Sequence, residues 1–317
     1  MRRRNPVELV EAAIAGNRTS LARLLSIVEE GGPLAQQASS LVWPKGGQAY
    51  SVGITGSPGA GKSTLTDQLI GCGRKAGSEI AVLAIDPSSP YTGGAILGDR
   101  VRMGDHFTDE GVFIRSMATR GHLGGLALAA PEAVRVLDAA GFPWVLIETV
   151  GVGQVEVEIA GAADTTVVVV TPGWGDSVQA NKAGIMEIAD IFVINKADRK
   201  GAGETQRDLE GMMDLSSFGH DDWRPPVLRT IAATGEGVGE LWSTIAQHRE
   251  RIVGDGTLQQ RRERRLRAEV LATMSRIVES RALSGEGEQR FETLIADVIA
   301  RRVDPRNAAA MLLESAS

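Results

Sequence analysis

Residues 56–64 read Gly56-Ser57-Pro58-Gly59-Ala60-Gly61-Lys62-Ser63-Thr64. This stretch follows an apolar run over 50–55 and leads into another over 65–70, an order that predicts strand, glycine loop and helix. Glycines let the backbone fold tightly enough for several N–H groups to point at one phosphate. Lys62 can then reach the β- and γ-phosphates, and the Ser63 hydroxyl is placed to bind Mg²⁺. We interpret 56–64 as a nucleotide phosphate loop; the alternative is an ordinary glycine-rich turn.

The composition favours an α/β protein. A chain of 317 residues can form one core of about 200 residues with flanking pieces, and its few aromatics beside abundant Gly, Ala and Val argue against an all-β sandwich. The net charge of −6 argues against a nucleic-acid or anionic-membrane binder; the Arg-rich runs 2–4 and 261–265 read more simply as solvated faces. No run of about 18 apolar residues and no signal-like N-terminus occurs, so we expect a soluble, cytoplasmic protein.

Apolar periodicity divides the chain into three parts. Helical spacing over 6–41 predicts an N-terminal helical extension, which we assign to 1–45. The part 46–253 alternates helices with apolar strands, which indicates a mainly parallel sheet covered on both faces. The predicted strands lie near 50–55, 79–85, 112–115, 144–147, 165–171, 191–194 and 227–231. Helical stretches near 258–282, 287–302 and 305–315 carry apolar stripes, and we assign 254–317 to a C-terminal helical arm.

Acidic residues follow two of the predicted strands. Asp86 comes after the run 79–85 and Glu148 after 144–147. In an open α/β sheet ligands bind outside the carboxyl ends of the strands, so both should lie near the phosphate loop. Carboxylates suit Mg²⁺ held through water, and Asp99 is a further candidate. The alternatives are helix caps: Asp86 and Glu148 after their strands, and Asp99 before a helix that starts at Arg100.

The tetrapeptide Asn195-Lys196-Ala197-Asp198 follows the strand 191–194, where a purine would lie. The Asp198 carboxylate can accept hydrogen bonds from N1–H and the 2-amino group of guanine, whereas adenine offers neither donor. The pattern therefore predicts GTP and GDP rather than ATP; the alternative is a turn after a strand. The usual Ser-Ala loop beneath the base lacks its Ser here, so backbone amides of Ala232 and Ala233 would have to bind the base carbonyl.

The chain resembles the MeaB/ArgK family. The resemblance rests on the motifs above together with the stretch 86–100 and Glu148-Thr149-Val150-Gly151-Val152-Gly153-Gln154. That family comprises P-loop GTPases of the SIMIBI class, chaperones of adenosylcobalamin-dependent acyl-CoA mutases. The resemblance covers nearly the whole chain. It implies that Lys62 and Ser63 serve the phosphates and Mg²⁺. It also implies that Asp86, Asp99 and Glu148 surround the metal, and that Asn195, Lys196 and Asp198 read guanine.

The resemblance assigns a further role to the segment 172–182, similar to the third switch of the family. It implicates Asp176, Gln179 and Lys182 in coupling to the mutase, and Lys182 is the catalytic candidate among them. Trp174 departs from the smaller residue expected there. The family dimerises through its C-terminal arm, which implies a homodimer.

The resemblance predicts a GTPase that gates cobalamin loading or protection of a mutase such as methylmalonyl-CoA mutase. A cobalamin-binding Asp-x-His-x-x-Gly is missing, so the mutase must be a separate protein. One Cys and four scattered His argue against nickel or zinc delivery. Val152 stands where many GTPases carry a water-orienting Gln, which predicts hydrolysis that is slow alone and stimulated by the partner. The alternatives are an ArgK-like transport-associated ATPase or kinase and a translation GTPase, although no RNA-binding module is attached.

Overall fold

The computed structural model describes residues 5–86, 106, 108–118, 123–149, 163–174, 187–215, 219, 222–284 and 286–314. These residues fall into two units, Met1–Leu258 and Gln259–Ser317, which are described separately below. Several residues named above lie outside the described residues, namely Asp99, Arg100, all of 150–154, Asp176, Gln179 and Lys182. Asp86 is described in its backbone only.

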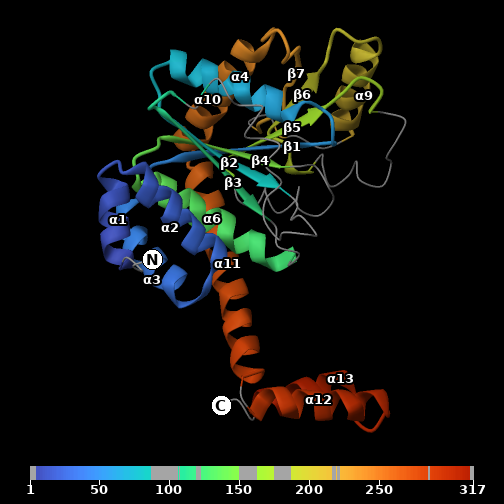
Figure 1. Cartoon of the computed structure of the whole chain (residues 1–317). Coiled ribbons are helices and arrows are strands. Elements are labelled where there is room, and N and C mark those ends of the chain that lie inside the picture. Colours follow the sequence, from blue (N-terminus) through green and yellow to red (C-terminus); the bar gives the residue numbers. More distant parts are fainter. Residues whose placement is uncertain are drawn as a thin grey trace. The chain divides into compact units, whose positions relative to one another are not determined.

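Seven parallel strands form one sheet in the order β3-β2-β4-β1-β5-β6-β7 (Figure 1). The strands are β1 (Tyr50–Gly56), β2 (Ile80–Asp86), β3 (Val112–Ala118), β4 (Trp144–Thr149), β5 (Thr165–Val170), β6 (Ile191–Asn195) and β7 (Val227–Thr230). The chain adds β2 to β4 on one side of β1 and β5 to β7 on the other. In such sheets ligands bind at the carboxyl ends of the strands, at the point where the strand order reverses, which here is at β1. The predicted parallel α/β fold is confirmed.

Alternate side chains of the strands enter different layers of the core, because successive residues of a strand face opposite sides of a sheet. On one face Val167 and Val169 pack with α4 (Lys62–Lys75) and α10 (Val238–Gly254). On the other face Val168 and Val170 pack with α9 (Ala202–Asp214). Cys72 of α4 packs against the first layer, and burial raises the pKa of its thiol, as expected of a structural cysteine.

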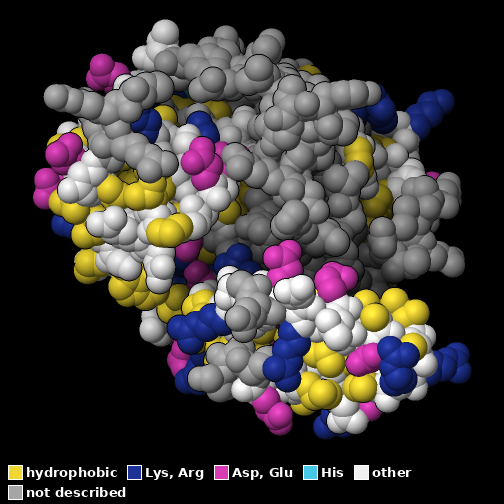
Figure 2. All heavy atoms as spheres, turned by 60° about the horizontal axis from the view of Figure 1, so that its bottom comes forward, with side chains coloured by type: hydrophobic (Ala, Val, Ile, Leu, Met, Phe, Trp, Pro, Cys, Tyr) yellow, Lys and Arg dark blue, Asp and Glu magenta, His cyan; other side chains and the backbone are white. Residues whose placement is uncertain are grey.

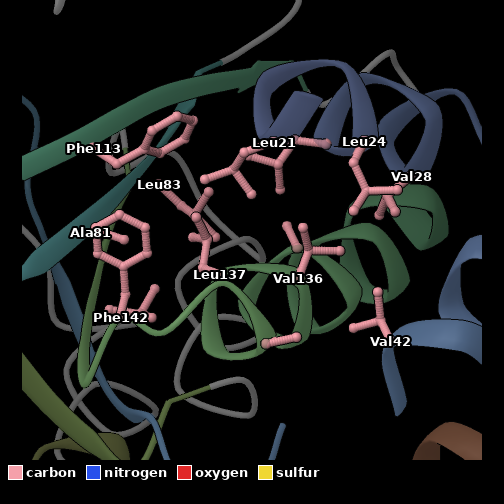
Figure 3. Close-up of a cluster of buried hydrophobic side chains, with 14 of the residues drawn as sticks. Leu21, Leu24, Val28, Val42, Ala81, Leu83, Phe113, Val136, Leu137 and Phe142 are labelled. Carbon is pink, nitrogen blue, oxygen red and sulfur yellow. The ribbon is translucent and has the colours of Figure 1, made fainter. Parts of the chain in front are cut away.

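The N-terminal helices form part of the sheet's own core. They are α1 (Pro6–Ile14), α2 (Arg18–Glu30) and α3 (Gly32–Val42), followed by a 3₁₀ turn over Trp43–Lys45. Leu21, Leu24 and Val28 of α2 face α6 (Leu123–Ala139) and the sheet beside it (Figure 3). Arg115 of β3 also pairs with Glu29 of α2 at 3.0 Å. The extension thus covers one face of the sheet together with α6.

The second unit consists of helices that bury little apolar surface. They are α11 (Thr257–Ala282), α12 (Glu286–Ile299) and α13 (Pro305–Glu314). Among the described residues of this unit, the buried apolar side chains are Ala282, Leu294 and Ala308. The large apolar side chains that remain exposed are Leu266, Val270, Leu271, Met274, Ile277, Val278, Ile295, Ile299, Met311 and Leu313. Figure 2 shows apolar groups lying between charged ones on the face turned to the viewer.

None of the helices in the described ranges is both long and apolar enough to cross a membrane. The longest, α11, has 26 residues but carries many charged side chains.

Candidate nucleotide-binding site

The phosphate loop follows β1 at the point where the strand order reverses, and two of its glycines are required by close packing. Gly56 has φ +136°, and a Cβ there would lie 1.9 Å from the Val169 carbonyl oxygen. Gly61 has φ +91°, and its Cβ would lie 2.4 Å from Asn195 Nδ2. A larger residue would push the loop away from β5 or from Asn195, so the motif keeps both contacts only with glycine.

Lys62 is the first residue of α4, and its ammonium lies inside the loop. The side chain is 5% exposed, and Nζ donates to the carbonyl oxygens of Gly56 at 2.7 Å and Ser57 at 3.0 Å. Gly61 precedes the helix in a left-handed conformation and provides no side-chain cap. Both the positive end of the α4 dipole and the Lys62 charge favour a phosphate at this end of the helix.

Two oxygen groups meet at the start of this helix, one from α4 itself and one from β4. The Ser63 hydroxyl donates to Glu148 Oε1 at 2.5 Å. Glu148 is 4% exposed and stands on β4 opposite Ile54 of β1 and Ala84 of β2. A hydroxyl beside a buried carboxylate, next to a phosphate loop, fits the oxygen ligands that Mg²⁺ prefers. Asp86 ends β2 at the same edge of the sheet.

Asn195 connects the phosphate loop with the loop after β7. It is 2% exposed, and its Nδ2 donates to the Ala60 carbonyl oxygen at 2.8 Å. Its Oδ1 accepts from the Thr230 hydroxyl at 3.1 Å and from the Ala232 amide at 3.0 Å. In this arrangement Asn195 holds the phosphate loop at a fixed distance from the loop after β7.

The loop after β7 offers one backbone donor to a base. The Ala232 amide is committed to Asn195, and the amides of Thr234 and Gly235 both donate to the Ile231 carbonyl. Within the described part of the chain the Ala233 amide makes no hydrogen bond. Of the two amides expected to bind the base carbonyl, that of Ala233 is therefore the available one.

Lys196 and Asp198 differ sharply in their surroundings. Lys196 has φ +59°, a conformation that few non-glycine residues adopt, and its Nζ donates to the Gly59 carbonyl at 2.7 Å. Its aliphatic chain thus extends from the loop after β6 to the phosphate loop. Asp198 is exposed, and its carboxylate makes no hydrogen bond or ion pair with the residues that the structure describes. Its four acceptor lone pairs are available to a ligand.

Replacing Asn195 by aspartate is expected to weaken GDP binding about 10- to 100-fold and to lower the free energy of unfolding by about 1–3 kcal/mol. The change keeps the shape but turns the donor toward Ala60 into an acceptor, which places a buried carboxylate against a carbonyl oxygen. Calorimetry with GDP and thermal unfolding measure both effects. Asn17→Asp, which keeps the cap of α2, is the control. Unchanged GDP affinity in Asn195→Asp would contradict the bridging role.

Comparison with known proteins identifies the family. Residues 21–286 match the family model described as methylmalonyl Co-A mutase-associated GTPase MeaB. The chain belongs to the MeaB family. This membership and the fold make it a GTP-hydrolysing enzyme that binds guanine nucleotides.

None of the described residues forms a cluster of three or more His, Cys, Asp or Glu side chains that could hold a metal ion.

Individual members and structures agree with the assignment to the MeaB family. A protein of Pyrococcus abyssi named as a GTPase is 50% identical over 309 residues, covering 97% of this chain and 95% of that protein. The mouse mitochondrial homologue of methylmalonic aciduria type A protein is 37% identical over 217 residues, covering 68% of this chain and 52% of that protein. The crystal structure of an LAO/AO transport system kinase has a TM-score of 0.74 at 27% identity, covering 99% of this chain and 98% of that one.

Proposed function

We propose that this MeaB-family chain is a GTP-hydrolysing chaperone for an adenosylcobalamin-dependent acyl-CoA mutase, such as methylmalonyl-CoA mutase. GTP binding and hydrolysis would gate the loading or protection of the mutase's cobalamin. The observation that carries the proposal is the family match over 21–286, because the family is defined as mutase-associated. The mouse relative, whose name refers to methylmalonic aciduria, supports the same partner class.

The phosphate end of the site supplies the chemistry for hydrolysis. Lys62 and the first N–H groups of α4 would bind the phosphates and stabilise the charge that develops on the transferred phosphoryl group. Ser63 and Glu148 would hold Mg²⁺, with Asp86 and Asp99 as further candidate ligands. When bound, the ion neutralises charge on the β- and γ-phosphates. The Ser63–Glu148 hydrogen bond of 2.5 Å supports this role, because it already brings the two oxygen ligands together.

The base end would select guanine. Asp198 would accept from N1–H and the 2-amino group, and the Ala233 amide would donate to the base carbonyl. Lys196 would lie along the base, with its Nζ on the Gly59 carbonyl. Each group presents to guanine the hydrogen-bonding partner that it needs, while adenine would leave Asp198 without a donor.

The second candidate function is an ArgK-like transport-associated ATPase or kinase. The observation in its favour is the likeness to a solved structure named as a transport system kinase. Thermal unfolding with GDP, GTP or ATP separates the two functions, because a ligand stabilises by about 2.7 kcal/mol at 100 times its Kd. The chaperone proposal predicts stabilisation by GDP and GTP and no shift with ATP; stabilisation by ATP alone would favour the kinase.

Affinity capture tests the partner. The full chain is immobilised with a non-hydrolysable GTP analogue, incubated with the native lysate, and compared with the same chain incubated with ATP in place of the analogue. The proposal predicts that a cobalamin-dependent acyl-CoA mutase is retained with the guanine nucleotide. Retention of transport components in its place would support the second function.

We further propose that the part 254–317 is a dimerisation arm. Its exposed apolar residues exceed its buried ones, and a second copy of the chain could cover them. Removing 258–317 is expected to give a monomer that still binds GDP, because the site lies in the other unit. Light scattering and GDP calorimetry check both statements.

A point variant makes the test of the dimer independent of truncation. Val270 is 66% exposed within the chain, so Val270→Asp should not disturb the fold but should dissociate a dimer formed through α11. Leu34→Asp, at another exposed apolar residue, is the control. A full-length chain that is monomeric at micromolar concentration would contradict the proposal.

A further inference from the structure

Trp174 is buried although it lies just beyond the carboxyl end of β5, at the rim of the site. Its side chain is 6% exposed. The preceding turn is closed by the Trp174 amide, which donates to the Thr171 carbonyl at 3.1 Å, and it passes through Gly173 at φ +84°. The backbone therefore turns the indole back into the protein.

The indole packs in the same apolar layer as part of the proposed base-reading loop, residues 195–201. Trp174 belongs to the apolar cluster formed by β5, β6 and α9, which includes Ala202, Leu209 and Met213 of that helix. Ala197, inside the tetrapeptide 195–198, packs against the same cluster. The base-reading loop and the indole thus share one set of neighbours.

Backbone contacts join the Trp174 turn to the far end of the base-reading loop. The Gly173 amide donates to the Thr205 hydroxyl, in the first turn of α9, at 3.2 Å. Gly201, which immediately precedes α9, comes close to the turn: a Cβ built on it would lie 3.8 Å from the Gly173 nitrogen and from Pro172 Cβ. The loop 195–201 is consequently held at one end by Asn195 and at the other by this turn.

Asp198 lies between these two anchors, and its side chain makes no hydrogen bond or ion pair with the described residues. Within the part of the chain that the structure describes, the position of its carboxylate is thus set by the backbone of the loop. Two parallel hydrogen bonds to one base edge require correct donor–acceptor distance and angle for both, so a small shift of the loop weakens them.

We infer that Trp174 is a positioning residue for guanine selection, acting through Asp198. Its indole packs in the cluster that includes Ala202 at the start of α9, and this packing sets the position at which the loop presents the carboxylate. The inference rests on the guanine-reading role proposed for Asp198. An alanine at 174 would leave a cavity in this cluster, into which Ala202 and Leu209 can move. The end of the loop at Gly201, which immediately precedes α9, would then shift with the helix.

The test compares GDP with inosine diphosphate, which lacks the 2-amino group. One charge-assisted hydrogen bond separates the two ligands, so the affinity ratio for the wild-type full chain should be about tenfold or more. In Trp174→Ala the ratio should fall toward one, because the carboxylate no longer meets the 2-amino group. Trp174→Phe, which refills much of the space, should restore it. Diphosphates are used so that contacts to the γ-phosphate do not enter the comparison.

Met213→Ala is the matched control. Met213 is 2% exposed, belongs to the same cluster and lies at the opposite end of α9 from the loop. The variant Met213→Ala should destabilise the fold as Trp174→Ala does, yet keep the wild-type ratio of GDP to inosine diphosphate affinity. If Trp174→Ala does not fold, Trp174→Leu and Trp174→Phe should show a ratio that falls with the volume removed.

A wild-type ratio in folded Trp174→Ala or Trp174→Leu would overturn the inference. An equal fall of the affinity ratio in Met213→Ala would also overturn it, since the effect would then come from destabilising the cluster as a whole. The variant Asp198→Asn shows whether a failed test is due to the role proposed for Trp174 or to the guanine-reading role proposed for Asp198. If that variant binds GDP as wild type does, the guanine assignment is wrong; if it binds GDP weakly while Trp174→Ala keeps the ratio, only the role of Trp174 is wrong.

Discussion

Replacing Asp198 by asparagine is expected to weaken GTP binding about 100-fold, because a carboxylate that accepts two hydrogen bonds is worth about 1.5–3 kcal/mol per bond. The amide keeps one acceptor oxygen but turns an NH₂ group toward a donor of the base. Xanthosine triphosphate carries an oxygen at C2, so the same NH₂ group can donate to it, and its affinity should rise. The preference between the two nucleotides should therefore reverse or nearly vanish.

Calorimetry with both nucleotides measures this exchange of preference. The substitution should not disturb the fold, since Asp198 is exposed and its side chain makes no hydrogen bond or ion pair with the described residues. Asp208→Asn, an exposed aspartate on α9, makes the same chemical change away from the loop and should leave both affinities unaltered. Unchanged GTP affinity in Asp198→Asn would show that another group reads the base.

The strands of the sheet were predictable because each is a continuous apolar run bounded by breakers. The run 165–170, for example, is buried at every position in the structure. Helix α9 received no assignment from the sequence, since it is polar and contains Gly211. A signal was nevertheless present: Thr205, Leu209 and Met213 recur every four residues, and all three are buried.

The site was predictable as a list of motifs but not as a set of contacts. Asn195 binds a carbonyl 135 residues earlier in the chain, and no local pattern states that its amide joins two loops. The burial of Trp174 likewise depends on α9, which follows it in sequence. His248, one of four scattered histidines, is fully buried with Nδ1 2.7 Å from the Thr165 hydroxyl. Such pairings follow from the topology of the sheet and could not be derived from spacing.

GTP turnover is expected to be slow in the isolated chain and to rise strongly with the mutase. The residue after Gly151 is Val152, which cannot orient a water molecule, while Lys62 still stabilises the phosphate charge. Supplying a missing catalytic group raises the rate by about 10³–10⁵ in other GTPases, and a loop movement can give less. We propose that Lys182 supplies it, so Lys182→Ala should lower the stimulated rate toward the basal one. Lys45→Ala, a change in the linker before β1, is the charge-matched control.

The most direct test of the proposed chaperone function is the GTP turnover of the full chain, measured at saturating GTP with and without a purified adenosylcobalamin-dependent acyl-CoA mutase. We start with methylmalonyl-CoA mutase and include any cobalamin enzyme retained by the chain in affinity capture. The account predicts a low rate alone and a rate that rises with mutase concentration until it saturates. A rate that is already fast alone, or that no cobalamin-dependent mutase changes, would contradict it.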